Sequence, residues 1–363
     1  MTIVGTRPEI IRLSLIIEKL DRYADEHIFV HTGQNYDEKL SDIFFKELNV
    51  RKPDYHIRLS SNAIGAQIGE MFREVEKILL KHRPKKMLVL GDTNSALCAF
   101  LGERYGIPVY HMEAGNRCHD ETVPEELNRK VIDSIASFNL PYTETAKNNL
   151  IREGMHPQRI WVSGNPIYEV IEHYKADIAK SDILKELQLT PKRYFLVTAH
   201  RAENVDVKER LQNIVQSLKI IARKYKLPVI CSVHPRTKDR LTTFGIQNDE
   251  PLVKFCEPFG FFDFIQLQQH AKCVLTDSGT VQEESCILKV PSVTIRNSTE
   301  RPETVLCGSN VVSGLEIDQI VSAVDIMIEA KTDWKLPEGY GDPNVSRKVV
   351  QFILGGLSHL SNC

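Results

Sequence analysis

The sequence predicts an α/β protein with two similar-sized domains, each a doubly wound parallel sheet, that face each other across a cleft. Short apolar runs alternate with amphipathic segments of helical period, which is the pattern of parallel strands joined by crossover helices. The alternation pauses around Gly164-Asn165-Pro166 and then restarts. A chain of 363 residues is also long enough for two hydrophobic cores. We therefore place the domain boundary after residue 166.

Residues 1–166 contain four clear strand candidates, with helices between them. The strands are expected at Thr2–Val4, His27–His31, Lys86–Leu90 and Val109–Met112. The helices include Glu9–Leu20, Ala63–Lys81 and Pro124–Ala136. The last of these begins with a proline and two acids, a composition that the positive end of a helix dipole favours.

Residues 167–343 hold a second series of the same kind. Strands are expected at Tyr194–Thr198, Pro228–Ser232, Val253–Phe255, Cys273–Thr276 and Ser292–Ile295. Helices are expected at Lys208–Lys224, Phe261–Ala271 and Val281–Leu288.

Composition argues against several classes of protein. The chain has 46 basic and 48 acidic side chains, so it carries no global charge that would attract nucleic acid. It has no apolar run near the ~20 residues of a membrane span, and it begins on a strand rather than a signal peptide, so we expect a soluble, cytoplasmic protein. The eight cysteines form no CxxC pair, which indicates neither a zinc site nor a disulfide framework.

Ligands of doubly wound sheets bind outside the carboxyl ends of the strands, so the residues just after each strand are the first candidates for a site. The first strand is followed by Gly5-Thr6-Arg7-Pro8-Glu9, where Arg7 and backbone N–H groups could meet an anion. The GxGxxG fingerprint of dinucleotide cofactors is absent. A tight turn with a surface arginine is the alternative interpretation.

Two carboxylates, Asp92 and Glu113, follow neighbouring strands of the first domain. Acids that share a cleft repel each other and lose solvation, so their pKa values separate and one can hold a proton that the other lacks. This suits general acid and base catalysis. The alternative is that Asp92 caps a helix and Glu113 pairs with an arginine. Glu125 and Glu126, at the start of the next helix, could also reach the cleft.

The second domain carries basic and small residues at the same kind of position. His200 and His234 each follow a strand and lie beside or near an arginine, which favours substrate contact over an ordinary surface histidine. The turn Asp277-Ser278-Gly279-Thr280 offers hydroxyl and N–H groups to a phosphate. The remaining candidates are Glu284, which could bind a ribose, and Arg301, which could pair with a diphosphate.

One known family shares a series of short segments with this chain. The segments are GTRPEIIRL, LGDTNS, MEAGNRC with PEELNRK, TAHRAEN, SVHPR, LTDSGTVQEES and TERPE. In this order they resemble the motifs of the non-hydrolysing UDP-N-acetylglucosamine 2-epimerases, from Gly5 to about Gly314. The resemblance implies two Rossmann-like domains of the GT-B type and a homodimer. It also implies that the last helix, roughly Asn344–Leu354 within residues 344–363, packs back on the first domain, and that residues 167–343 bind UDP.

Members of this family invert C2 of a UDP-linked 2-acetamido sugar, a precursor of surface polysaccharides, without a redox cofactor. Anti elimination of UDP gives a 2-acetamidoglycal, and re-addition with protonation from the opposite face gives the epimer. The resemblance places Asp92, Glu113, Glu125 and His200 at catalytic positions and leaves open which acid serves which face.

The resemblance also assigns a UDP site. It places Glu284 on the ribose, Phe264 against the uracil, and Arg301 with the Ser278–Thr280 turn on the phosphates. The other residues that it places near UDP are Arg7 and His234.

Several positions depart from the commonest pattern of the family. Arg12 stands where many members carry lysine, and MEAGNRC and DSGT replace EAGLRT and DSGG. These variants resemble the branch that acts on UDP-N-acetyl-L-fucosamine precursors of the talosamine type or on UDP-2,3-diacetamido-glucuronates, so Arg12 is a candidate substrate-binding residue. The paired glutamines that bind an activating second substrate appear as Gln34 and Asp37, which weakens the expectation of substrate activation.

Three other activities fit parts of the pattern. A GT-B glycosyltransferase would share the fold and the UDP site, but it needs only one base where this chain has three matched acids. A hydrolysing epimerase often continues into a kinase domain, for which too little chain follows Leu354. A non-catalytic nucleotide-sugar sensor would not need the complete set of carboxylates.

Overall fold

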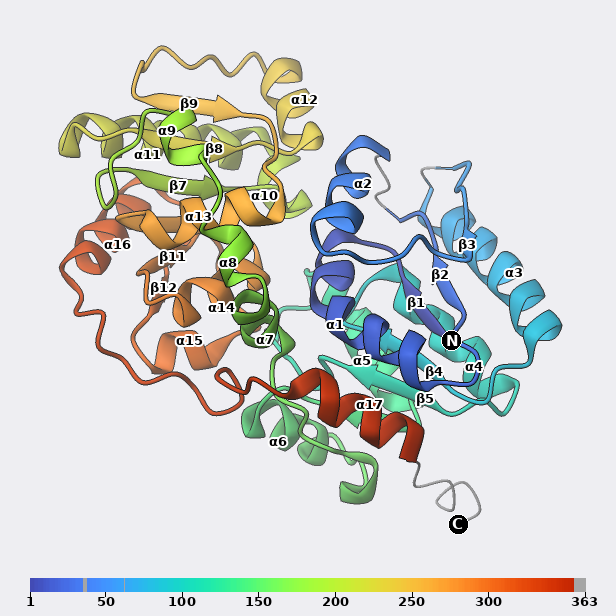
Figure 1. Ribbon diagram of the computed structural model, residues 1–363. Coiled ribbons are helices and arrows are strands. Elements are labelled where there is room, and N and C mark those ends of the chain that lie inside the picture. Colours follow the sequence, from blue (N-terminus) through green and yellow to red (C-terminus); the bar gives the residue numbers. More distant parts are fainter. Residues whose placement is uncertain (35–37, 62, 356–363) are drawn as a thin grey trace. The chain divides into compact units, whose positions relative to one another are not determined.

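The computed structural model describes residues 1–34, 38–61 and 63–355 of the chain (Figure 1). The chain forms two compact units. Unit 1 comprises Met1–His173 together with the chain from Glu338 onward, and unit 2 comprises Tyr174–Pro337. The division thus falls after helix α7 (Pro166–His173) rather than before it. The reason is that α7 packs against helices α1 (Arg7–Tyr23) and α17 (Val345–Gly355) of unit 1.

Unit 1 is built on a six-stranded sheet whose strand pairs are all parallel. Its order is β3 (Tyr55–His56), β2 (Phe29–His31), β1 (Thr2–Val4), β4 (Met87–Leu90), β5 (Val109–Met112) and β6 (Phe138–Leu140). The chain reverses its direction of winding between β1 and β4, and at such a switch point the loops after the two strands diverge and leave room for a ligand.

Helices on both sides bury the sheet of unit 1. Alternate strand residues such as Ile3, Val30 and Val89 share one apolar cluster with side chains from α3 (Ile64–His82), α4 (Ala99–Arg104) and α5 (Pro124–Ile135). Helix α1 packs instead on α7 and α17. The remaining elements are α2 (Glu38–Glu47), the 3-10 helices η1 (Asn94–Cys98) and η2 (Pro157–Arg159), and α6 (Glu144–Arg152).

Helix α17 brings the end of the described chain back to unit 1. The ring of Phe352 stacks on Trp161, with ring centres 4.6 Å apart, and meets Tyr110 and Phe138 edge-on. At the first turn of α17, the backbone N–H of Ser346 donates a hydrogen bond of 2.6 Å to Glu169 of α7. Aromatic burial and this cap fix the helix against the sheet edge.

The sheet of unit 2 has the same strand order as the sheet of unit 1 when its strands are counted from β7. The order is β12 (Asn310–Val312), β11 (Ser292–Thr294), β10 (Cys273–Thr276), β7 (Phe195–Thr198), β8 (Val229–Ser232) and β9 (Val253–Cys256), again with all pairs parallel. The direction of winding reverses between β7 and β10. Both sheets therefore have the strand order of a Rossmann fold.

The central strands of unit 2 are buried on both faces. Phe195 and Val197 face a cluster formed with α11 (Lys208–Tyr225) and α16 (Ile317–Glu329), whereas Tyr194 and Leu196 face one formed with α9 (Ile183–Glu186), α13 (Phe261–His270) and α14 (Gly279–Ile287). The other helices are α8 (Lys175–Ile178), α10 (Ala202–Val205), α12 (Pro235–Thr243) and α15 (Pro302–Leu306).

Every strand and helix that the sequence pattern predicted is present, with ends shifted by a few residues. Strands β3, β6 and β12 were not predicted. Each is only two or three residues long and contains a polar residue, His56, Asn139 or Asn310, so none forms an apolar run. Among the described helices, none is both long and apolar enough to cross a membrane.

Candidate functional site

Glu9 joins the two loops at the switch point of unit 1. Its carboxylate accepts hydrogen bonds from the N–H of Gly5 (3.0 Å) and the hydroxyl of Thr6 (2.7 Å), which follow β1. It also accepts one from the hydroxyl of Thr93 (3.1 Å), which follows β4. Burial raises the pKa of Glu9 to about 7, against the effect of these hydrogen bonds. Glu9 lies in the GTRPE segment, but no role was predicted for it.

Gly5 is at this point because no larger residue fits. A Cβ atom there would lie 1.8 Å from Oγ of Ser95 and 2.6 Å from Oγ1 of Thr32. Ser95 in turn donates to Oε1 of Gln34 from both its N–H and its hydroxyl, each at 3.0 Å. Gln34 therefore helps hold the loop after β4. Asp37, its expected companion, lies outside the described residues.

Glu113, directly after β5, combines an unusual backbone conformation with a buried arginine partner. Its φ of 67° lies in the left-handed region, which non-glycine residues seldom adopt and which is concentrated at functional sites. Arg12 donates a hydrogen bond to the Glu113 carboxylate within a buried ion pair. The guanidinium of Arg12 also lies 5.7 Å from the ring centre of Tyr142, whose hydroxyl is 3.4 Å from the same carboxylate.

Thus Glu113 does pair with an arginine, the alternative raised from the sequence. Pairing and catalysis are compatible, because an ion pair and a hydroxyl that converge on one carboxylate also fix its direction.

Asp92, after β4, is held by Arg129 of α5. Two nitrogens of the guanidinium lie 2.8 Å from Oδ2 of Asp92. Asp92 is not the helix cap of the alternative interpretation, because the N-cap of η1 is Thr93. The side chain of Asp92 retains 20% of its exposure, so the carboxylate is anchored yet accessible.

Glu125 and Glu126, neighbours on α5, have different environments. Glu126 is buried, pairs with Arg129 at 2.5 Å, and accepts hydrogen bonds from the N–H groups of Cys118 and His119. Burial alone would raise the pKa of Glu126, but the backbone hydrogen bonds and Arg129 outweigh it and lower the pKa. Glu126 therefore fixes the loop before α5, whereas Glu125 remains half-buried and is the better candidate for contact with a ligand.

A second buried network, which the sequence analysis did not single out, supports the loops after β4 and β5. Asp133 lies 2.9 Å from Nδ1 of His111 and 2.7 Å from the guanidinium of Arg117. His111 also contacts the carbonyl of Gly91 at 2.8 Å, and Asp133 accepts from the N–H of Gly115. Burial alone would raise the pKa of Asp133, but His111 and Arg117 hold it below its usual value. Arg117 belongs to the MEAGNRC segment, and this is the feature of the sequence that could have pointed to the network.

In unit 2 a buried acid, Asp277, occupies the switch point. It follows β10, and its Oδ2 accepts hydrogen bonds from the N–H groups of His200 and Arg201, both at 2.9 Å, and from Asn204 at 3.1 Å. These three residues follow β7. Asp277 therefore fixes the backbone on which His200 stands.

The structure brings the two predicted histidines together. The rings of His200 and His234 have centres 6.2 Å apart. The side chain of His200 is 45% exposed, and its Nδ1 lies 3.5 Å from Asp277. His234 is the N-cap of α12 and accepts a hydrogen bond from the N–H of Arg236. His234 thus has a structural role whatever else it contacts.

The turn at the start of α14 is packed tightly against the ERPE segment. Ser278 is the N-cap of α14, and a Cβ on Gly279 would lie 2.6 Å from Oε1 of Glu300. Arg201 and Arg296 hold Glu300, at 3.1 and 2.7 Å. Glycine is therefore needed where the backbone approaches this acid.

The other predicted nucleotide-site residues have varied surroundings. Arg301 forms a buried ion pair with Glu283 of α14. Glu284, the next residue on α14, is also buried. Phe264 is partly buried against the apolar cluster beneath α13. In unit 1, the guanidinium of Arg7 lies 5.6 Å from the ring centre of Phe44.

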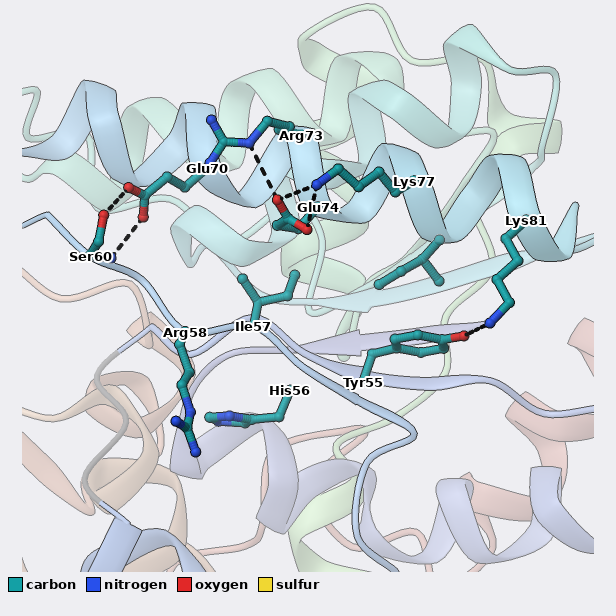
Figure 2. Close-up of a pocket in the computed structure, with 11 residues that line it drawn as sticks. Tyr55, His56, Ile57, Arg58, Ser60, Glu70, Arg73, Glu74, Lys77 and Lys81 are labelled. Carbon is teal, nitrogen blue, oxygen red and sulfur yellow. Dashed lines mark hydrogen bonds and ion pairs between the residues drawn. The ribbon is translucent and has the colours of Figure 1, made fainter.

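A groove of about 570 Å³ lies elsewhere in unit 1, between β3 and α3 (Figure 2). Its charged side chains bind one another. Glu74 pairs with Lys77 and Arg73, while Lys81 donates to the hydroxyl of Tyr55. A smaller groove of about 470 Å³ lies beside α12 in unit 2. Neither is lined by a predicted site residue.

No group of three histidine, cysteine, aspartate or glutamate side chains is arranged as a metal site within residues 1–34, 38–61 and 63–355.

Comparison with known proteins identifies relatives over the whole chain. A relative from Methanocaldococcus jannaschii, named UDP-N-acetylglucosamine 2-epimerase, is 44% identical over 98% of both chains. A solved structure of the enzyme of that name and organism, in complex with UDP-GlcNAc and UDP, has a TM-score of 0.93, 42% identity, and covers 98% of this chain and 99% of its own. The UDP-2,3-diacetamido-2,3-dideoxy-D-glucuronate 2-epimerase of Pseudomonas aeruginosa is 34% identical, covering 97% of this chain and 98% of its own.

The fold is shared more widely than the sequence. A glycosyltransferase involved in lipopolysaccharide biosynthesis aligns with a TM-score of 0.61 at 11% identity, over 98% of both chains. That likeness concerns the fold alone and confirms the predicted α/β class, with two Rossmann-like domains of the GT-B type. The family model described as UDP-N-acetylglucosamine 2-epimerase matches residues 18–354. The chain therefore belongs to the UDP-N-acetylglucosamine 2-epimerase family, the non-hydrolysing isomerases whose motifs the sequence resembles.

Proposed function

We propose that the protein inverts C2 of a UDP-linked 2-acetamido sugar by eliminating and re-adding UDP, without a redox cofactor. The observation that carries this proposal is the set of acids at the carboxyl ends of β4 and β5 and at the start of α5. Asp92 and Glu113 are each anchored by a buried arginine, and Glu125 stays half-buried. The relative from M. jannaschii, solved with UDP-GlcNAc and UDP, supports the same class of substrate.

The proposed chemistry explains why several acids are needed. The proton on C2 has no adjacent carbonyl, so a base alone would not remove it readily, and its loss must accompany the departure of UDP from C1. Re-addition from the opposite face then needs an acid on that face. We propose Asp92, Glu113, Glu125 and His200 as the groups that move these protons, with the order among them open. Their fixed positions favour this, because proton transfer depends on geometry before pKa.

We propose that unit 2 binds the nucleotide. The turn Ser278–Thr280 begins α14, so its N–H groups and hydroxyls can meet phosphate oxygens. Arg301 would then exchange its contact with Glu283 for one with the diphosphate, and Glu284 would bind the ribose. His234 and Arg7 are assigned to the same ligand, and Phe264 to the uracil.

Arg12 bears on which UDP-linked sugar the protein uses. Its guanidinium is planar and always charged, so it can hold the Glu113 carboxylate and stack on Tyr142, whereas lysine offers a compact point charge. The relative named UDP-N-acetylglucosamine 2-epimerase, 44% identical, supports UDP-GlcNAc and its C2 epimer as the principal substrates. A UDP-2-acetamido-2,6-dideoxy-L-talose and a UDP-2,3-diacetamido-glucuronate are the alternatives, and the 34% identical relative supports the second of them. In each case we propose a cytoplasmic role in making surface polysaccharide precursors.

We also propose that the protein is a homodimer. Phe100 of α4 and Leu127 and Val131 of α5 are exposed apolar side chains on helices that contact each other, and Phe100 stacks on Phe72 of α3. Exposed apolar side chains that lie together can mark an interface. A second copy of the chain is the partner that we propose.

Leu127→Glu should convert the dimer into a monomer, because it places a charge on the proposed interface. Light scattering of the purified protein should give about twice the chain mass of 41.4 kDa for the wild type and the chain mass for the variant. Ile326→Glu, which alters an equally exposed apolar residue on α16 of unit 2, is the control and should stay dimeric. A monomeric wild type would refute the proposal.

Epimerisation in deuterated water should place deuterium at C2 of the product, because the abstracted proton exchanges with solvent before re-addition. Mass spectrometry and proton NMR of the product measure the label. Product formed without label at C2 would argue against the proposed route, as would a nicotinamide bound stoichiometrically to the purified protein.

Asp92→Asn, Glu113→Gln and Glu125→Gln should each lower turnover by roughly two powers of ten or more, the usual effect of losing a positioned acid or base. UDP affinity, measured by calorimetry, should change much less. Glu121→Gln is the matched control, because Glu121 lies just before the same helix with its side chain 87% exposed. Loss of UDP binding in proportion to turnover in all three variants would mean that these residues bind or fold rather than catalyse.

Arg12→Lys should narrow the preference among sugars. If Arg12 helps to define the substrate branch, the wild type should use a 6-deoxy or uronate UDP-2-acetamido sugar with higher kcat/KM than UDP-GlcNAc, and the variant should bring the two values closer together. Arg22→Lys, in the last turn of the same helix, is the control and should leave the ratio unchanged. Equal use of UDP-GlcNAc by the wild type, with the same ratio in Arg12→Lys, would show that Arg12 is a neutral replacement.

A further inference from the structure

Two cysteines of unit 2 that are distant in the sequence have their sulfur atoms in contact. Cys286 lies near the end of α14 and is fully buried, whereas Cys307 follows α15 and is half-buried. The two Sγ atoms are 3.7 Å apart. Cys307 stands between Leu306, whose exposed fraction is 80%, and the exposed Gly308, so it is the member of the pair that lies nearer the surface.

The backbone on each side of this contact is fixed by hydrogen bonds. The indole N–H of Trp334 donates to the carbonyl of Cys286 at 3.0 Å, and the N–H of Cys307 donates to the carbonyl of Glu303 at 3.1 Å. A disulfide has sulfur atoms about 2.05 Å apart. The two atoms therefore need to approach by less than about 2 Å to form one.

The pair is chemically asymmetric. The hydrogen bond from the Cys286 thiol, the largest effect, lowers the pKa of Cys307, with a further contribution from the nearby ammonium group of Lys289. The same hydrogen bond and burial raise the pKa of Cys286. Since the thiolate is the nucleophile in thiol oxidation, Cys307 is suited to attack an oxidant and Cys286 to resolve the product.

We propose that Cys307 and Cys286 form a site of oxidative modification, at which a peroxide converts two thiols into a disulfide. The Cys307 thiolate attacks one peroxide oxygen, the O–O bond breaks, and the departing hydroxide takes up a proton to leave as water. Cys307 then carries a sulfenic acid. The sulfur of Cys286 attacks that of Cys307, the S–O bond breaks, and the hydroxyl leaves as a second water with the proton from Cys286. The two sulfurs lose two electrons, and the peroxide gains them.

This inference does not depend on the proposed substrate. The sulfur contact and the exposure of Cys307 carry it. The disulfide would join two helices that begin at Gly279 and Pro302, next to the segments assigned to the nucleotide.

The test treats the folded wild-type protein with hydrogen peroxide, blocks the remaining thiols with N-ethylmaleimide and maps the peptides without reduction. We expect a peptide pair linked through Cys286 and Cys307, lighter by two hydrogens and separated by dithiothreitol. Cys286→Ser should leave a sulfenic acid at Cys307 that dimedone traps, and Cys307→Ser should leave Cys286 as a thiol. Cys256→Ser, which removes another half-buried thiol, is the control and should retain the link.

A measurement on the wild type alone covers the case in which a variant fails to fold. Iodoacetamide at pH 7 should alkylate Cys307 at least about tenfold faster than Cys118 and Cys256, two half-buried thiols whose pKa burial raises, because far more of Cys307 is thiolate. Alkylation at equal rates, or peroxide treatment that yields no linked peptide, would overturn the proposal.

Discussion

One buried carboxylate in each unit ties together the loops at the switch point of its sheet. Glu9 connects the loop after β1 with the loop after β4, and Asp277 connects the loop after β10 with the loop after β7. Loops that diverge at a switch point leave backbone N–H groups without strand partners, and a buried N–H without a partner is costly. The carboxylates satisfy these groups and fix the two loops relative to each other. The candidate residues Asp92 and His200 stand on loops fixed in this way.

The two acids reach this arrangement through different hydrogen-bond partners. Glu9 accepts one N–H and two hydroxyls, and burial outweighs these bonds, so the pKa of its carboxyl rises to about 7. Asp277 accepts two N–H groups and an amide, and it lies beside the imidazole of His200. Burial thus brings the pKa of the carboxyl at the switch point of unit 1 close to neutral pH.

The sequence predicted the fold class well because apolar strands and amphipathic helices alternate with few interruptions. It failed for β3, β6 and β12, whose short polar segments become strands only because a neighbouring strand offers free backbone groups. The residues expected at strand ends were correctly placed there, since the carboxyl ends of parallel strands meet at one edge of a sheet. Side-chain partners were less predictable. The ion pair between Arg12 and Glu113 joins residues 101 positions apart, and no local pattern encodes such a distance.

The arginines of the family motifs are held by internal acids. Arg12 pairs with Glu113, Arg129 with Asp92 and Glu126, and Arg301 with Glu283. Buried pairs of this kind gain little net stability over apolar packing, so their presence needs another reason. An arginine that is already held by an ion pair and desolvated loses less side-chain entropy when an anion approaches. Under the proposed function, the diphosphate would compete with Glu283 for Arg301. Glu113 and Asp92 would keep the side-chain orientations that Arg12 and Arg129 give them. The pairing would thus allow a chain with a net charge of −2 to bind a substrate that is itself strongly negative.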